Sequence, residues 1–244
     1  MILHQVTTVE AGEALGRSPL GVITCGATEQ HGPHLPLSTD TIGGWALARK
    51  VAERLDCVLA PPIPVGCSDY HLNWPGTLSI SPATMTSTIC EIAESLQTHG
   101  VKNILIVNGH GGNRSAVDVA ASQLVRTGGV SVVVAYFQGL AFKAAGGEMD
   151  LGHAGHVETA VVLREAPELV KMELATGGTD LAEALRRERE FSARDIYRPM
   201  LDWESVSESG WFGDAAAATA EQADPLLEKM ADRVVEYVSN AFVK

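Results

Sequence analysis

Short runs of apolar, often β-branched residues alternate along the chain with longer segments in which apolar positions recur every three or four residues. The short runs predict buried strands at residues 20–26, 57–66, 103–108 and 130–137. The longer segments predict helices at residues 41–55, 81–100, 115–126 and 226–242. Three prolines in 57–66 indicate an edge strand or a strand end. Ser81 and Pro82 are typical of an N-cap and a first helical position.

This alternation of strands and helices predicts an α/β fold: one three-layer α/β/α domain with a mostly parallel central sheet, covered on both faces. A chain of 244 residues suits a single domain, here 1–244, and the sequence has neither an internal repeat nor a long linker. With 45% hydrophobic and 20% charged residues, its composition excludes a disordered or fibrous protein.

Net charge and apolar run length narrow the choice of partners and compartment. The net charge of −12 leaves no basic surface for nucleic acid or an anionic membrane, so we expect neither as a partner. No apolar run is long enough for a membrane span, and the N-terminal residues do not resemble a signal peptide. The four cysteines lack CxxC spacing and are expected to be reduced thiols in a cytoplasmic protein.

Polar side chains capable of binding metal follow the predicted strands. Glu29 and His31 are two residues apart, so in an extended segment both point to one face. Asp40 precedes or starts the next helix, where Thr39 or Asp40 is available as N-cap and where a carboxylate could also bridge two metals. His110 stands between glycines, which allow close approach of backbone and metal. Their convergence at strand ends predicts a divalent metal site.

Two other interpretations of these residues stay open at this point. The glycine-rich turn 108–113 could cradle the phosphate of a nucleotide or sugar phosphate at a helix N-terminus, in a protein without catalytic activity. It lacks the GxGxxG order and the lysine of a Walker loop, and it leaves Glu29, His31 and Asp40 unexplained. The chain could also be a metal-binding scaffold that has lost its chemistry.

At these residues the sequence resembles the creatininase family of metal-dependent hydrolases. The matching motifs are EQHGPHLP at 29–36, Asp40, HLNWPGT at 71–77, NGHGGN at 108–113 and HAGHVET at 153–159. The resemblance implies a three-layer α/β fold, a homo-oligomer that is often a hexamer, and two divalent cations, which are zinc, manganese or iron.

The resemblance also implies roles for individual residues. Glu29 and His110 should bind one metal and His31 the other, with Asp40 as the bridge. His153 and Glu158 should form an acid/base pair beside the metals, with Glu158 alternatively a direct ligand. Substrate-binding roles are expected for His71, Trp74 and His156.

Two positions depart from the creatininases proper. Gly112 stands where they have a metal-binding glutamate, and Gly111 where they have an aromatic residue near the substrate. The first departure predicts a weak or missing second metal, or replacement of the ligand by Glu158 or a water. The second argues against creatinine as substrate, because a flat stacking partner is lost.

These observations together predict a metal-dependent hydrolase of the amidohydrolase type. A metal-activated water is expected to attack an amide, formamide, lactam or cyclic keto group of a small molecule, with non-peptide C–N bonds as the expected target. The alternative within the family is a peptidase acting on a small peptide in cofactor maturation. The motifs do not choose between these substrates.

Overall fold

A sheet of four parallel strands forms the centre of the computed structural model, which describes residues 1–146, 152–191, 199–200 and 202–242. The strands are arranged in the order β2-β1-β3-β4 and comprise β1 (Leu20–Cys25), β2 (Val58–Leu59), β3 (Asn103–Asn108) and β4 (Ser131–Tyr136). Leu20 of β1 lies opposite Asn103 of β3, and Cys25 lies opposite Asn108, so both strands end at the same level.

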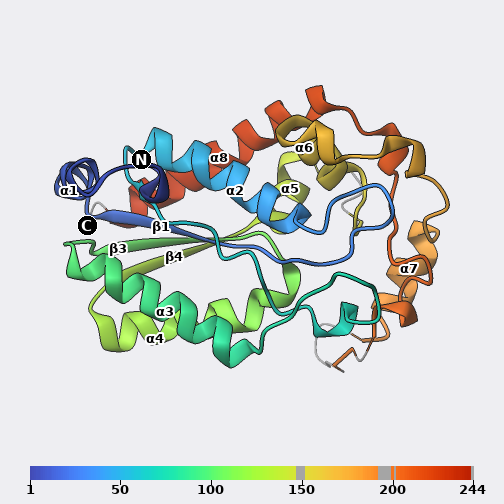
Figure 1. Ribbon diagram of the computed structural model, residues 1–244, viewed down its shortest axis with the longest axis horizontal. Coiled ribbons are helices and arrows are strands. Elements are labelled where there is room, and N and C mark those ends of the chain that lie inside the picture. The colour runs from blue at the N-terminus through green and yellow to red at the C-terminus, as the bar shows by residue number, and fades with distance from the viewer. Residues whose placement is uncertain (147–151, 192–198, 201, 243–244) are drawn as a thin grey trace.

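Helices cover both faces of this sheet, which gives three layers (Figure 1). One face carries α2 (Thr39–Arg54), α5 (Phe137–Ala144), α6 (His156–Glu165) and α8 (Ala220–Phe242). The other carries α3 (Pro82–Thr98) and α4 (Arg114–Gly128). The remaining helices are α1 (Thr8–Arg17) and α7 (Leu181–Glu188). The predicted α/β fold with a parallel sheet is confirmed.

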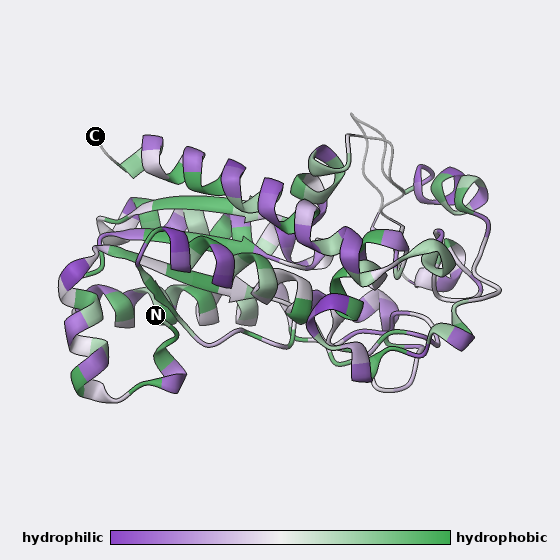
Figure 2. Cartoon of the chain, turned by 90° about the horizontal axis from the view of Figure 1, so that it is seen from above, coloured by the Kyte–Doolittle hydropathy of each residue, from purple (hydrophilic) through white to green (hydrophobic). Residues whose placement is uncertain are grey.

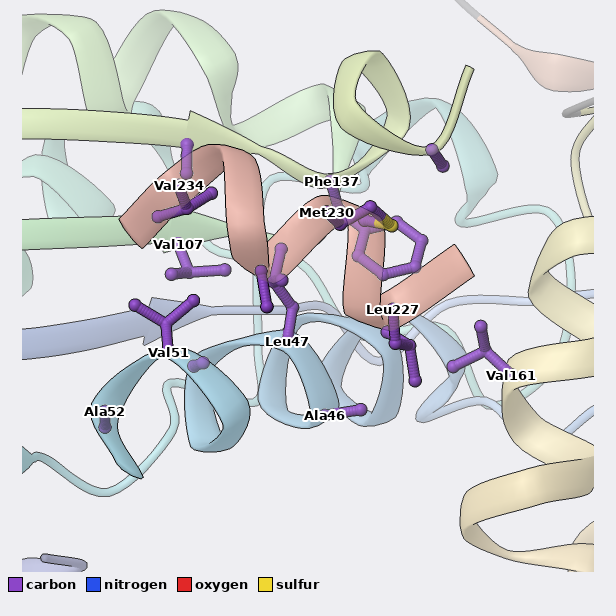
Figure 3. Close-up of a cluster of buried hydrophobic side chains, with 14 of the residues drawn as sticks. Ala46, Leu47, Val51, Ala52, Val107, Phe137, Val161, Leu227, Met230 and Val234 are labelled. Atoms are coloured by element: carbon purple, nitrogen blue, oxygen red, sulfur yellow. The ribbon is translucent and has the colours of Figure 1, made fainter. Parts of the chain in front are cut away.

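Alternate residues of the strands are buried in two separate cores. Leu105 and Val107 of β3 pack against Leu47 of α2 and Leu227 of α8 on one face (Figure 3). Ile104 and Ile106 point to the opposite face, against α3 and α4. The strands are therefore apolar along their length, while the outer faces of the helices are polar (Figure 2). No helix in the described part of the chain is long and apolar enough to cross a membrane.

Two local predictions need correction. The strand expected at 57–66 is only two residues long, because prolines cannot donate to a sheet; beyond Pro61 and Pro62 a single parallel bridge joins Ile63 to Cys25 of β1. The N-cap position of α2 is Ser38, so the N-cap role expected for Thr39 or Asp40 is wrong. Asp40 instead lies within the first helical turn. By contrast, Ser81 caps α3 as predicted, since its side chain accepts a hydrogen bond from the backbone N–H of Thr84.

Candidate metal centre

The candidate site lies at the carboxyl ends of β1 and β3, where parallel sheets commonly bind ligands. β1 leads into Glu29 and His31, and β3 leads into His110. Asp40 is in the first turn of α2. Gly109 permits close approach of this turn, because a Cβ atom at residue 109 would lie 2.2 Å from the backbone oxygen of Asp40. Three segments thus deliver titratable side chains to one place.

Glu29, Asp40 and His110 form the first group of potential metal ligands. One ligand atom from each lies within 4.8 Å of the others, and all three residues are buried. Nδ1 of His110 is 3.0 Å from Oδ2 of Asp40, and Nε2 of His110 is 3.3 Å from Oε2 of Glu29. Buried carboxylate and imidazole groups of this kind suit zinc, manganese and iron.

His31, Asp40 and Glu158 form the second group, which shares Asp40 with the first. Nε2 of His31 is 3.5 Å from Oδ1 of Asp40 and 3.8 Å from Oε2 of Glu158. Asp40 therefore turns one oxygen to each group, as a bridging carboxylate would. Glu158 comes from α6, and the N–H of Ala154 donates to its Oε2 at 2.7 Å.

Backbone carbonyl groups orient both histidines. Nδ1 of His31 lies 3.0 Å from the carbonyl oxygen of Glu29, and Nε2 of His110 lies 3.1 Å from that of Cys67. A carbonyl oxygen only accepts, so each of these nitrogens carries a proton. The other nitrogen of His31 faces Asp40 and Glu158, and the other nitrogen of His110 faces Asp40. Metal-binding histidines typically have this arrangement.

Three buried atoms of the cluster make no well-directed hydrogen bond to any residue that the structure describes. They are Oε2 of Glu29, Nε2 of His31 and Oδ2 of Asp40. A buried polar atom left without a partner costs about 1–3 kcal/mol, so native proteins seldom retain one. Divalent cations bound in the two groups would provide all three atoms with a partner. The residues present therefore fit such cations.

Burial and close packing shift the pKa values of the cluster. Burial raises the pKa of Glu29 and that of Glu158 to about 7. Burial alone would lower the pKa of His31 and of His110, but the adjacent carboxylates outweigh it and raise these pKa values to about 10 and about 9. Burial opposes ionisation of Asp40 as well, yet both imidazoles hold its pKa well below the ordinary value. A cation entering the site must therefore displace protons.

His153 lies beside the second group. Its ring centroid is 4.4 Å from that of His31. Its Nε2 is 2.9 Å from the carbonyl oxygen of Gln30 and so carries a proton, while Nδ1 faces Oε1 of Glu29 at 3.9 Å. Burial lowers the pKa of His153 well below its ordinary value. The ring is thus neutral, with a lone pair turned toward the cluster, and it can accept a proton there.

The three residues expected to bind substrate occupy different places. His71 is buried in the cluster, with Nε2 3.2 Å from Oε1 of Glu29. The half-buried ring of Trp74 lies next to His71, at a centroid distance of 6.0 Å. His156 lies outside the cluster, because its Nε2 is paired with Oε1 of Gln222 in α8 at 2.9 Å.

Sequence reasoning missed two residues that touch the cluster. The amide of Gln30 contacts both His71 and His153 at 3.0 Å. The hydroxyl of Ser68 lies 3.3 Å from Nε2 of His110. The position of Gln30 between two expected ligands was the available signal, whereas Ser68 belongs to no motif.

The turn at Gly112 has no room for a side chain. A Cβ atom at residue 112 would lie 2.3 Å from the carbonyl oxygen of Cys67, 2.5 Å from Nε2 of His110 and 2.7 Å from the hydroxyl of Tyr70. At Gly111 it would meet no atom within 4 Å. A glutamate at residue 112 is therefore incompatible with this backbone, and Glu158 is the second carboxylate beside His31.

Comparisons with known proteins point to one family. The family model for creatininase, described as creatinine amidohydrolase, matches residues 4–238. The mycofactocin precursor peptide peptidase of Mycolicibacterium smegmatis is 35% identical, over 88% of this chain and 84% of that protein. The creatinine amidohydrolase of Pseudomonas putida is 25% identical, over 96% of this chain and 92% of that protein. A solved structure named Creatininase Mn shares the fold, with a TM-score of 0.78 and 23% identity. The match covers 100% of this chain and 99% of that one.

The raised pKa values of His31 and His110 predict that metal binding depends on pH. In the metal-free site, both rings carry a proton on each nitrogen, and hence a positive charge, up to about pH 9. Cation binding at pH 7.5 should therefore release about one proton from each ring. Metal affinity should then rise with pH until about pH 10. Calorimetric titration with Zn²⁺ in two buffers of different ionisation enthalpy measures this release. An affinity that is constant from pH 7 to pH 10 would contradict it.

The packing of the glycine turn generates a second prediction. Gly112→Ala should weaken metal binding by about 10–100-fold, because the new methyl group displaces the ring of His110 and the Cys67 carbonyl that orients it. Gly111→Ala is the matched control and should bind metal like the wild type. Elemental mass spectrometry and circular dichroism would report metal per chain and folding. Equal metal content in the two variants would refute the packing argument.

Proposed function

Because the chain belongs to the creatininase family, we propose that it is a metal-dependent hydrolase that cleaves an amide bond of a short peptide. The resemblance found in the motifs is confirmed, and the chain is a hydrolase of this family with candidate metal-binding groups. The observation that carries the proposal is that two groups of potential ligands, both largely buried, share Asp40, with neutral His153 beside them.

Glu29, Asp40 and His110 would hold one divalent cation, and His31, Asp40 and Glu158 would hold a second. When bound, these cations supply an activated water and polarise the carbonyl group to be cleaved. Zinc, manganese and iron all suit the mixed donor set. Since Glu158 completes the second group, the glycine at residue 112 does not leave that group short of a carboxylate.

His153 would move the proton during cleavage. Nδ1 has a free lone pair directed at the cluster, so it would accept a proton and transfer it to the leaving nitrogen. The carbonyl oxygen of Gln30 holds the other ring nitrogen and keeps the ring in this orientation. Glu158 would act as a ligand, and its raised pKa also suits the acid/base role expected from the motif.

The relatives bear on the choice of substrate. A peptide substrate is supported by the peptidase of Mycolicibacterium smegmatis at 35% identity, whereas the creatinine amidohydrolase of Pseudomonas putida is 25% identical. The expectation of a non-peptide C–N bond stays a prediction, as do the homo-oligomer and the cytoplasmic location. Gly111 continues to argue against creatinine, since it offers no ring for stacking.

A substrate panel tests this proposal. Metal-loaded protein would be incubated with short peptides and, separately, with small amides and lactams, and the products identified by mass spectrometry. We expect cleavage of peptides that stops when a chelator removes the cations and returns when they are restored. Turnover of lactams alone would contradict the peptide substrate. If no substrate were turned over at full metal occupancy, the proposal that the protein is a hydrolase would be contradicted.

The proton-transfer role predicts a separation of activity from metal binding. His153→Ala should lower kcat by about 10²–10⁴-fold, because the leaving nitrogen loses its proton donor, while metal per chain stays at the wild-type value. His99→Ala is a suitable control, since His99 is exposed at the end of α3, away from the cluster. Unchanged kcat, or a parallel loss of metal, would be evidence against this role.

A further inference from the structure

The side chain of Gln30 is buried and held in one orientation. Its Oε1 accepts a hydrogen bond from the N–H of Gly32 at 3.1 Å, and its Nε2 donates to the carbonyl oxygen of Gly210 at 2.6 Å. Exchanging the oxygen and nitrogen of the amide would break both bonds. Nε2 therefore has one remaining hydrogen to donate.

Two imidazole nitrogens lie within reach of that hydrogen. Nδ1 of His71 and Nε2 of His153 are both 3.0 Å from Nε2 of Gln30. Nε2 of His153 already carries a proton, since it lies 2.9 Å from the carbonyl oxygen of Gln30, and so it cannot accept. The remaining hydrogen goes to Nδ1 of His71.

This assignment determines the tautomer of His71. An accepting Nδ1 is unprotonated, so the proton of the ring is on Nε2. That nitrogen lies 3.2 Å from Oε1 of Glu29, within donor–acceptor distance. The two oxygens of Glu29 thus differ in their surroundings: Oε1 faces the N–H group of His71, whereas Oε2 lies 3.3 Å from Nε2 of His110 without a well-directed hydrogen bond to a described residue.

We propose that His71 is a positioning residue whose Nε2–H holds Oε1 of Glu29 and thereby turns Oε2 toward the cation, with Gln30 setting the required tautomer. The inference rests on the metal centre of the proposed function. It gives His71 a role in metal binding in place of the substrate contact expected from its motif.

The ring of His71 also packs against aromatic neighbours, and the test must separate this packing from hydrogen bonding. Its centroid lies 4.9 Å from that of His153 and 4.7 Å from that of Trp203. His71→Phe keeps a ring of similar size but has no N–H group. His71→Gln loses the ring but places an amide N–H near the position of Nε2.

The experiment is a titration of each purified variant with Mn²⁺ alone, in competition with a chelator, with circular dichroism to check folding. His71→Phe should bind the ion at the Glu29 group about 10–100-fold more weakly than the wild type, and His71→Gln should restore most of that affinity. The opposite order of affinities would overturn the inference in favour of packing: His71→Phe would then bind Mn²⁺ like the wild type, and His71→Gln would bind it weakly.

A second variant keeps the proposal testable if His71→Phe does not fold. Gln30→Met retains the ring of His71 and a side chain of similar length, but removes the donor to Nδ1. It should also bind Mn²⁺ more weakly, and wild-type affinity in this variant would overturn the inference. Failure of the wild type to bind Mn²⁺, Zn²⁺ or Fe²⁺ would instead refute the proposed function itself.

Discussion

The molecule has to place three carboxylates and two imidazoles, nearly all of them buried, around one point. Ionised groups in such a place are costly unless each has a partner of opposite charge or a metal. Backbone groups supply part of the compensation: carbonyl oxygens hold the rings of His31 and His110, and the N–H of Ala154 holds Glu158. Three atoms of these residues make no well-directed hydrogen bond to any residue that the structure describes, which is why the cluster is best understood as a cation site.

The fold and much of the site were predictable because they depend on local sequence. Apolar spacing identifies the strands and the four longest of the described helices. Parallel strands end at one edge of the sheet, so residues that follow β1 and β3 must meet there. This reasoning places Glu29, His31 and His110 together. The family motif favoured the bridging role proposed for Asp40, since its place near a helix start was equally suited to an N-cap, which is Ser38 in the structure.

Other features depend on contacts between distant segments and had no signal in the local pattern. Gln30 is held by the carbonyl group of Gly210, 180 residues away, and any residue type could have supplied that carbonyl. The tight packing at Gly112 comes from Cys67 and Tyr70 in another loop. From the sequence, that glycine indicated a lost ligand. In the structure, a glycine is also needed at this position, because a Cβ atom would collide with the carbonyl oxygen of Cys67.

Metal content per chain in the wild type and in Asp40→Ala tests the shared-carboxylate centre most directly. Elemental mass spectrometry should find about two divalent ions per chain in the wild type and a loss of both in the variant, because Asp40 belongs to both groups. Asp69→Ala, which removes an exposed carboxylate of the neighbouring loop, should keep both ions. Two ions retained in Asp40→Ala, or none in wild type reconstituted with zinc, manganese or iron, would contradict the account.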